Sequence, residues 1–203
     1  MATATRDSNG RFTSNEAQEE HGRGRSLGVI GAAVAGGAAI GALAMLGRKA
    51  AVQAPTALAG NWAEALATEH KAVLKLFDAL EKTTETSTAK RNVMLAQLKH
   101  ALVKHDVQEG NVIYPALREA GYADEADHLT KDHGYVKQYL YELEMTPTSS
   151  PDWIVTLRKF RSDIERHMQE EETDLFPRLR AQLSEEKNKA LTATMNKEGF
   201  KVA

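Results

Sequence analysis

Apolar residues recur at intervals of three and four positions in four separate stretches of the chain, which is the spacing of one face of an α-helix. The stretches run from Trp62 to Leu80, from Leu95 to Val112, from Ala126 to Leu143 and from Trp153 to Glu171. The segments between them are short, and short connections favour antiparallel neighbours. The pattern therefore predicts an all-α fold, an antiparallel up-down four-helix bundle.

Proline and serine mark the helix boundaries. Pro115 and Pro177 follow the second and fourth stripes, and we expect those helices to end there. Ser150 followed by Pro151 is typical of an N-cap and first helical position. A last, short helix is predicted to start at Ser184.

The composition changes along the chain indicate five segments. Residues 1–26 are polar and without apolar periodicity, so we expect a disordered tail. The other four are predicted as an apolar Gly/Ala-rich helix (27–47), a linker containing Pro55 and Gly60 (48–60), the bundle (61–182), and a short C-terminal helix with a tail (183–203).

Residues 27–46 carry no charge over a length that suits one bilayer-spanning helix. Their glycine and alanine content makes insertion only marginally favourable. We expect a single-pass or peripheral membrane anchor and hence a membrane-associated protein. The alternative is a cytoplasmic protein in which this helix packs on itself, through the Gly37 and Gly41 spacing, or on a partner.

Composition and charge exclude several classes of site. The chain contains no cysteine, which excludes disulfides, thiolate metal sites and cysteine nucleophiles. Its formal net charge of −2 provides no overall field to attract nucleic acid, and we expect no nucleic-acid partner. Any metal must therefore be held by nitrogen and oxygen.

The two halves of the predicted bundle repeat one motif. His105, Glu109 and Pro115 recur 62 residues later as His167, Glu171 and Pro177. A further on-stripe histidine precedes each of these motifs, and the two are His70 and His133. Each half thus reads as His, about 34 residues, then His-x3-Glu-x5-Pro.

The repeated residues stand on the apolar stripes, where leucine would be expected. The six are His70, His105, Glu109, His133, His167 and Glu171. Burying them in one core costs several kcal/mol each, roughly, unless they are paired or bind metal. Two metal ions resolve this conflict, and imidazole with carboxylate suits iron, manganese or zinc.

Other polar and aromatic residues are interpreted more simply. A lone histidine on an apolar face is usually a satisfied core residue, but two matched motifs make that interpretation a poor one for the six. His21, His100 and His128 fall off the pattern and are interpreted as solvated. Glu170 and Glu172 are read as a charged face, and Met168, Tyr114 and Phe176 as core.

The sequence resembles the hemerythrin-like family of HHE cation-binding domains over about residues 61–182. The resemblance rests on His70, His133, and the two His-x3-Glu motifs with their following Ile113-Tyr114-Pro115 and Leu175-Phe176-Pro177. It implies a four-helix bundle with two iron ions joined by an oxo or hydroxo bridge. In that site His70, His105, His133 and His167 would be terminal ligands, and Glu109 and Glu171 would bridge the irons.

One departure from the family's oxygen carriers bears on function. They have a second histidine one turn from the third-helix ligand, whereas Leu129 and Lys137 stand four positions either side of His133. We therefore expect a protein that binds dioxygen, peroxide or nitric oxide and senses or responds to iron, oxygen or redox state. The alternatives are a di-iron enzyme that decomposes peroxide or nitric oxide or repairs iron centres, and an iron storage or handling protein.

Overall fold

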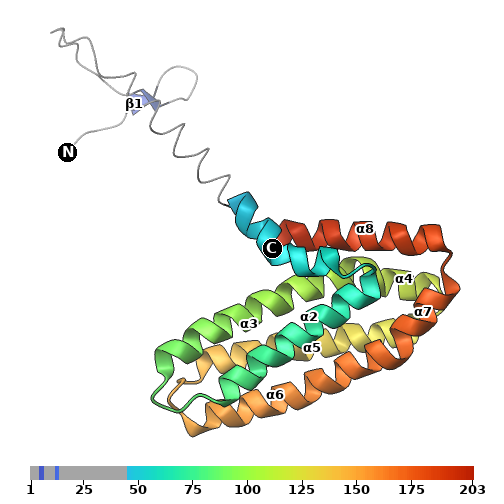
Figure 1. The fold of residues 1–203 in the computed structure, drawn as a ribbon. Helices are drawn as coiled ribbons and strands as arrows, with labels where there is room; N and C mark the ends of the chain where they lie inside the picture. The colour runs from blue at the N-terminus through green and yellow to red at the C-terminus, as the bar shows by residue number, and fades with distance from the viewer. Residues whose placement is uncertain (1–4, 7–11, 14–44) are drawn as a thin grey trace. The chain divides into compact units, whose positions relative to one another are not determined.

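A computed structural model of the chain describes residues 5–6, 12–13 and 45–203. Four long antiparallel helices form a bundle, which confirms the predicted all-α fold (Figure 1). They are α2 (Trp62–Glu81), α3 (Thr88–Gln108), α5 (Ala123–Met145) and α6 (Pro151–Glu170). The helix α2 packs against α3 and α6, and α5 packs against α6.

Two of the long helices continue past the prolines that were expected to end them. A π-helical turn η1 (Glu109–Ile113) joins α3 to α4 (Tyr114–Glu119), and η2 (Glu171–Leu175) joins α6 to α7 (Phe176–Gln182). The expectation of a stop at Pro115 and Pro177 was wrong. Each proline is the second residue of its short helix and directly follows the π-helical turn, whose wider hydrogen-bond spacing accommodates a residue without an N–H group.

Side-chain caps fix three helix starts, the first at α2, where Asn61 accepts a hydrogen bond from the backbone N–H of Glu64. Ser150 accepts a hydrogen bond from the backbone N–H of Asp152, which confirms the predicted N-cap of α6. Ser184 caps α8 (Glu185–Val202) in the same way. The helix α8 has 18 residues and packs on α3, so the C-terminal segment is not the short helix and tail expected from its sequence.

The segment predicted as a linker is also mostly helical. Residues 45–58 form a helix that ends before Gly60, whose φ of 95° lies in the region that favours glycine. Gln53 is buried and donates to Asn196 of α8, at 3.0 Å. Lys49 donates to the last carbonyls of α8. These tertiary contacts stabilise a helix that the local sequence does not predict.

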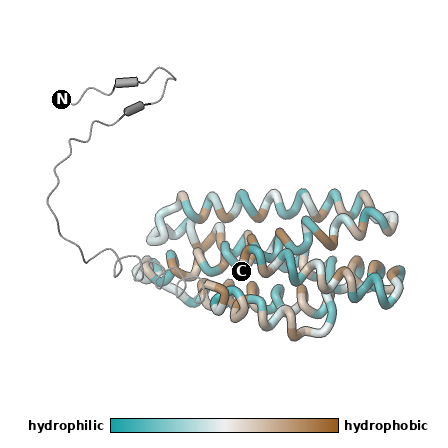
Figure 2. Tube along the Cα trace, turned by 90° about the horizontal axis from the view of Figure 1, so that it is seen from above, coloured by the Kyte–Doolittle hydropathy of each residue, from teal (hydrophilic) through white to brown (hydrophobic). Residues whose placement is uncertain are grey.

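The buried apolar side chains form two clusters at different positions along the bundle. One gathers around Trp62, Leu66, Tyr114 and Phe176, and the other around Phe77, Leu98, Trp153 and Phe160. Hydrophobic and hydrophilic positions alternate along the helices, as amphipathic helices require (Figure 2). Along α2, Leu66 belongs to the first cluster, Val73 to the second, and His70 lies between them.

The N-terminal predictions fall largely outside the described residues. Within the predicted tail, β1 (Thr5–Arg6) pairs antiparallel with β2 (Phe12–Thr13). The remaining tail residues and nearly all of the predicted apolar helix 27–47 are not described. Among the helices that are described, none has the length and apolar character needed to cross a bilayer.

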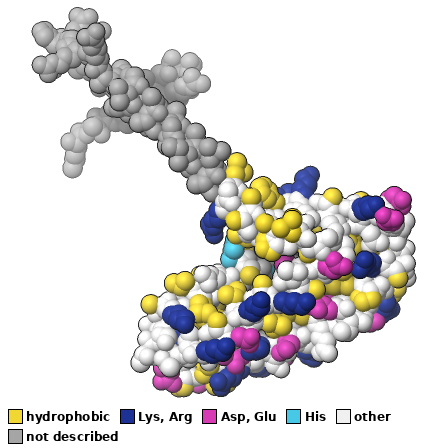
Figure 3. Space-filling model, in the orientation of Figure 1, with side chains coloured by type: hydrophobic (Ala, Val, Ile, Leu, Met, Phe, Trp, Pro, Cys, Tyr) yellow, Lys and Arg dark blue, Asp and Glu magenta, His cyan; other side chains and the backbone are white. Residues whose placement is uncertain are grey.

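The face of the bundle that Figure 3 shows carries positively and negatively charged side chains interspersed with one another.

Candidate metal centre

The six predicted site residues converge between the two apolar clusters. His70 comes from α2, His105 from α3, His133 from α5 and His167 from α6, while Glu109 and Glu171 begin the two π-helical turns. All six are buried, and both glutamates have no exposed surface. Four helices thus contribute to one site that apolar side chains close at both ends.

The donor atoms fall into two groups that share both glutamates. One contains His70, His105, Glu109 and Glu171, and the other contains Glu109, His133, His167 and Glu171. Within each group the atoms lie within 4.8 Å of one another. This is the arrangement expected for two cations joined by two carboxylates.

The carboxylate oxygens link the two groups in different ways. Oε2 of Glu109 lies 3.0 Å from Nε2 of His105 and 3.2 Å from Nε2 of His133. Glu171 uses both oxygens, with Oε2 3.5 Å from His70 and Oε1 3.5 Å from His167. Ligands about 2.1 Å from a metal and at right angles lie about 3 Å apart, so these spacings suit shared coordination.

A second layer of carboxylates orients the histidines. Nδ1 of His70 lies 2.7 Å from Glu172, Nδ1 of His105 lies 3.2 Å from Glu69, and Nδ1 of His133 lies 2.7 Å from Asp106. Nδ1 of His167 lies 3.5 Å from Asp132. A carboxylate only accepts, so the proton of a neutral ring stays on Nδ1 and the Nε2 lone pair faces the centre.

The helical stripes did not predict this second layer, and Glu172, which was expected on a charged face, lies 2.7 Å from Nδ1 of His70. The four acids are Glu69, Asp106, Asp132 and Glu172. Each stands next in sequence to a predicted ligand, and neighbours on a helix project about 100° apart. Each acid therefore points sideways and reaches a histidine of another helix. An acid beside four of the six predicted ligands is the signal that could have revealed them.

Tyr114 is also part of the site, although its sequence position suggested only core packing. Its hydroxyl lies 2.8 Å from Glu171 Oε1, 2.8 Å from His133 Nε2 and 3.2 Å from Glu109 Oε2. In an α-helix, residues five apart project in different directions, but the π-helical turn joins Tyr114 N–H to the carbonyl of Glu109. That turn places the tyrosine over the glutamate. Its counterpart in the repeat, Phe176, has no hydroxyl.

Burial and neighbouring charges shift the pKa values of Glu109, Glu171 and Tyr114 at the centre. Burial would raise the pKa of Glu109, but His105 and His133 outweigh burial and hold this pKa well below its usual value. Burial and the charge of Glu109 raise the pKa of Glu171. Burial, with both glutamates, raises the pKa of Tyr114 well above 10, so its hydroxyl keeps its proton.

Several buried atoms at this centre have no hydrogen-bond partner in the described part of the chain. They include Glu109 Oε1, Glu171 Oε2 and His167 Nε2. Such atoms cost roughly 1–3 kcal/mol each when they are left unpaired. All three belong to the predicted ligands, and nitrogen and oxygen donors of this kind suit divalent or trivalent iron. The residues therefore fit a pair of metal ions.

Of the three histidines outside the pattern, His21 lies outside the described residues, and His100 and His128 are not among the clustered donors. His128 is about half exposed and lies 3.7 Å from Glu170. His100 is partly buried, and its Nε2 has no partner among the described residues, so it is not simply solvated as expected. At the two positions one turn from His133, Leu129 is core and Lys137 pairs with Asp106 at 3.1 Å.

Comparison with known proteins agrees with this geometry. The sequence matches the family described as the hemerythrin HHE cation binding domain over residues 63–179, more than half of the chain. The protein belongs to this family, and its clustered histidines and glutamates are suited to holding metal cations.

Two relatives extend the comparison. An uncharacterised hemerythrin-like protein of Schizosaccharomyces pombe is 25% identical over 128 residues, which is 62% of this chain and 62% of that protein's length. The crystal structure of a hemerythrin HHE cation binding domain-containing protein of Mycobacterium kansasii superposes with a TM-score of 0.62. Its sequence identity is 23%, and the match covers 70% of this chain and 86% of the other. That structure supports the fold.

Proposed function

We propose that this is a non-haem di-iron protein that binds dioxygen, peroxide or nitric oxide and responds to iron, oxygen or redox state. The observation that carries the proposal is the sharing of Glu109 and Glu171 by two histidine pairs. Two adjacent metal ions need such bridging carboxylates. Four neutral histidines and two carboxylates also leave a buried charge of −2, which cations would neutralise.

A small cavity favours a ligand of very few atoms. It has a volume of about 30 Å³ and is lined by His105, His133 and His167 together with apolar residues that include Leu102 and Met168. A buried water needs roughly 10–15 Å³ of such space, so the cavity suits a diatomic molecule or peroxide. Its apolar wall favours an uncharged one.

Bound iron would supply redox chemistry and open coordination positions, while the protein supplies orientation and a dry site. The Nε2 atoms and the two glutamates would hold the metal pair. The outer carboxylates fix the histidine rings, and Lys104 with Thr56 in turn holds Glu69. The Tyr114 hydroxyl keeps a proton within hydrogen-bond distance of Glu171.

The decisive experiment is metal analysis of the purified protein together with optical spectra before and after reduction and re-exposure to air. We expect iron, with the visible absorption of an oxygen-bridged ferric pair, which zinc does not give. With no histidine one turn from His133, we also expect air oxidation of the reduced protein that vacuum does not reverse. Reversible oxygenation over several cycles would instead indicate an oxygen carrier. A purified protein that contains only zinc would overturn the proposal.

A second candidate function is an enzyme that decomposes peroxide or nitric oxide, or repairs iron centres. The Tyr114 hydroxyl favours it, because a protonated phenol among the predicted ligands can donate a proton during turnover. Iron-loaded protein would then consume peroxide catalytically, and Tyr114→Phe would slow turnover without loss of iron. Stoichiometric reaction alone would favour the sensor.

The N-terminal segment is proposed to determine where the bundle resides. Residues 27–46 are uncharged and long enough for one membrane crossing, which supports an anchor. The Gly37 and Gly41 spacing supports close packing of two copies of this segment. In either case the bundle would be held near a membrane surface or a second copy of the chain.

A further inference from the structure

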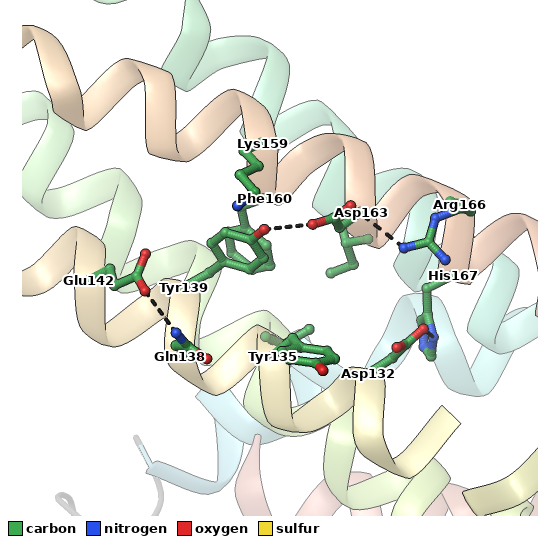
Figure 4. A pocket seen from close by; sticks show the side chains of 12 residues that line it. Asp132, Tyr135, Gln138, Tyr139, Glu142, Lys159, Phe160, Asp163, Arg166 and His167 are labelled. Carbon is green, nitrogen blue, oxygen red and sulfur yellow. Dashed lines mark hydrogen bonds and ion pairs between the residues drawn. The ribbon is translucent and has the colours of Figure 1, made fainter. Parts of the chain in front are cut away.

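A second and larger hollow lies outside the metal centre, between α5 and α6. It has a volume of about 320 Å³ and its walls include three aromatic rings, from Tyr135, Tyr139 and Phe160 (Figure 4). Val136 and Ile164 add apolar surface. This groove is at the small end of the range of roughly 300–1000 Å³ for pockets that bind organic molecules.

One end of the groove reaches a predicted metal ligand. His167 and Asp132 both line the groove and lie together at one end of it (Figure 4). Nδ1 of His167 and Oδ2 of Asp132 are 3.5 Å apart, and neither atom has a hydrogen-bond partner within the described residues. Both atoms are buried, and the His167 side chain is only 4% exposed.

This pair differs from the other three. The Nδ1 atoms of His70, His105 and His133 each lie within 3.2 Å of a carboxylate oxygen. Among the four histidines, only His167, which lines the groove, has its carboxylate, Asp132, too far away for a good hydrogen bond. An N–H donor and a carboxylate acceptor are therefore left unpaired at this end of the groove.

Hydrogen bonds and one ion pair engage several polar groups of the groove. Tyr139 donates to Asp163 at 2.5 Å, Arg166 lies 3.5 Å from the same carboxylate, and Gln138 donates to Glu142 at 3.0 Å (Figure 4). With Lys159 and Asp132, the lining has two basic and three acidic side chains. This excess of one acidic side chain disfavours an anion, and the basic side chains of Lys159 and Arg166 beside the rings leave little net charge to attract a cation.

We propose that this groove binds a small neutral phenol, with its ring among Tyr135, Tyr139 and Phe160 and its hydroxyl between His167 and Asp132. A hydroxyl group accepts from the Nδ1 proton and donates to the carboxylate, whereas an ether or a carbonyl only accepts. The ring gains aromatic contacts in addition to the apolar area that it buries. The site goes beyond the proposed function and is independent of which metal is bound.

The test is calorimetric titration of the full chain with 4-methoxyphenol, which has one hydroxyl and cannot chelate a metal. We expect saturable binding of one molecule per chain, both in metal-loaded and in chelator-treated protein. The matched probe 1,4-dimethoxybenzene lacks the hydroxyl and is expected to bind at least about tenfold more weakly. Equal binding of the two probes, or no saturable binding of the phenol, would overturn the proposal.

A pair of tyrosine variants locates the site. Tyr135→Ala removes a groove wall from α5 and is expected to weaken phenol binding at least about tenfold. Tyr141→Ala removes a tyrosine from the same helix that is 63% exposed and outside the groove, and it should leave binding unchanged. Both variants should keep the metal content and melting temperature of the parent. Equal phenol affinity in the two variants would contradict the assignment. A chain that binds the phenol but holds no iron would refute only the proposed function.

Discussion

Nε2 of His70 and Nε2 of His105 lie 2.9 Å apart in the bundle core. Each ring has its Nδ1 beside a carboxylate, Glu172 for His70 and Glu69 for His105. In the neutral rings, two lone pairs therefore face each other across a distance that only a shared proton or a shared cation makes favourable. This relationship makes the centre sensitive to metal and to pH, and it motivates the first three predictions.

Removing a predicted ligand should release metal. We expect His105→Ala or Glu109→Ala to lose roughly half or more of the bound metal, because each deletes a donor from the shared centre. Atomic absorption on purified protein measures this. His128→Ala is the matched control, since that side chain is 48% exposed and is not among the clustered donors. Loss of metal in the control but not in the other two would show that the ligand set is wrong.

Glu69, the outer carboxylate beside His105, should affect metal affinity almost as much as a ligand does. Glu69 accepts from His105 and from the buried amine of Lys104, and Glu69→Gln weakens both interactions. Metal affinity should fall about 10- to 100-fold, as for other carboxylates that orient metal-bound histidines. Competition with a coloured chelator measures the change. Glu144→Gln, which alters an exposed pair with Lys99, should leave the affinity as it was.

The stability of chelator-treated protein should fall as the pH rises. Burial would lower the pKa of His133, but hydrogen bonds to Asp106 and Glu109 outweigh it and raise this pKa to about 9. Protonated His133 thus stabilises the fold fully below about pH 6.5, and this contribution disappears as the pH rises through about 9. Thermal melts across that window should show a falling Tm.

Metal-loaded protein serves as the control for this pH dependence. Metal binding displaces the His133 proton, so the loaded protein should not show the fall, and metal affinity should increase over the same window. A Tm of chelator-treated protein that is constant or rising between pH 6.5 and 9 would contradict the assigned protonation.

The contact between α8 and the bundle should tolerate no extra methyl group at Gly199. A Cβ there would lie 2.7 Å from Gln108 Nε2 and 2.8 Å from Gln53 Oε1. We expect Gly199→Ala to lower the free energy of unfolding by about 1–3 kcal/mol. A Cβ at Gly134 on α5 would meet no atom within 4 Å, so Gly134→Ala should raise the free energy of unfolding by roughly 0.5–1 kcal/mol. Denaturant unfolding measures both, and equal stabilities would be evidence against this packing.

Membrane association is expected to depend on the N-terminal segment. The full chain should sediment with membranes and resist extraction by salt and alkaline carbonate. A variant that begins at Gly47 should stay in the supernatant and still bind metal, because it keeps Thr56 and its hydrogen bond to Glu69. Full-length protein that is monomeric in buffer without detergent would exclude the anchor.

The sequence alone determined the bundle and the six buried polar residues. Helical periodicity is a local property, so the stripes placed His70 and the later repeats on core faces before any partner was known. Matched spacing in the two halves then required the polar residues to meet. The absence of cysteine limited the donors to nitrogen and oxygen.

Only the tertiary structure decided what surrounds those six residues. The π-helical turns break the regular helical period, and so they bring Tyr114 to the centre from a position that an α-helix would turn away. The carboxylates of Glu69 and Asp106 hold histidines of other helices, and the helix at 45–58 exists because Gln53 and Thr56 pack against distant residues. These features depend on contacts between segments remote in sequence, so a local pattern can mark the acids beside the ligands but not the histidines that they contact.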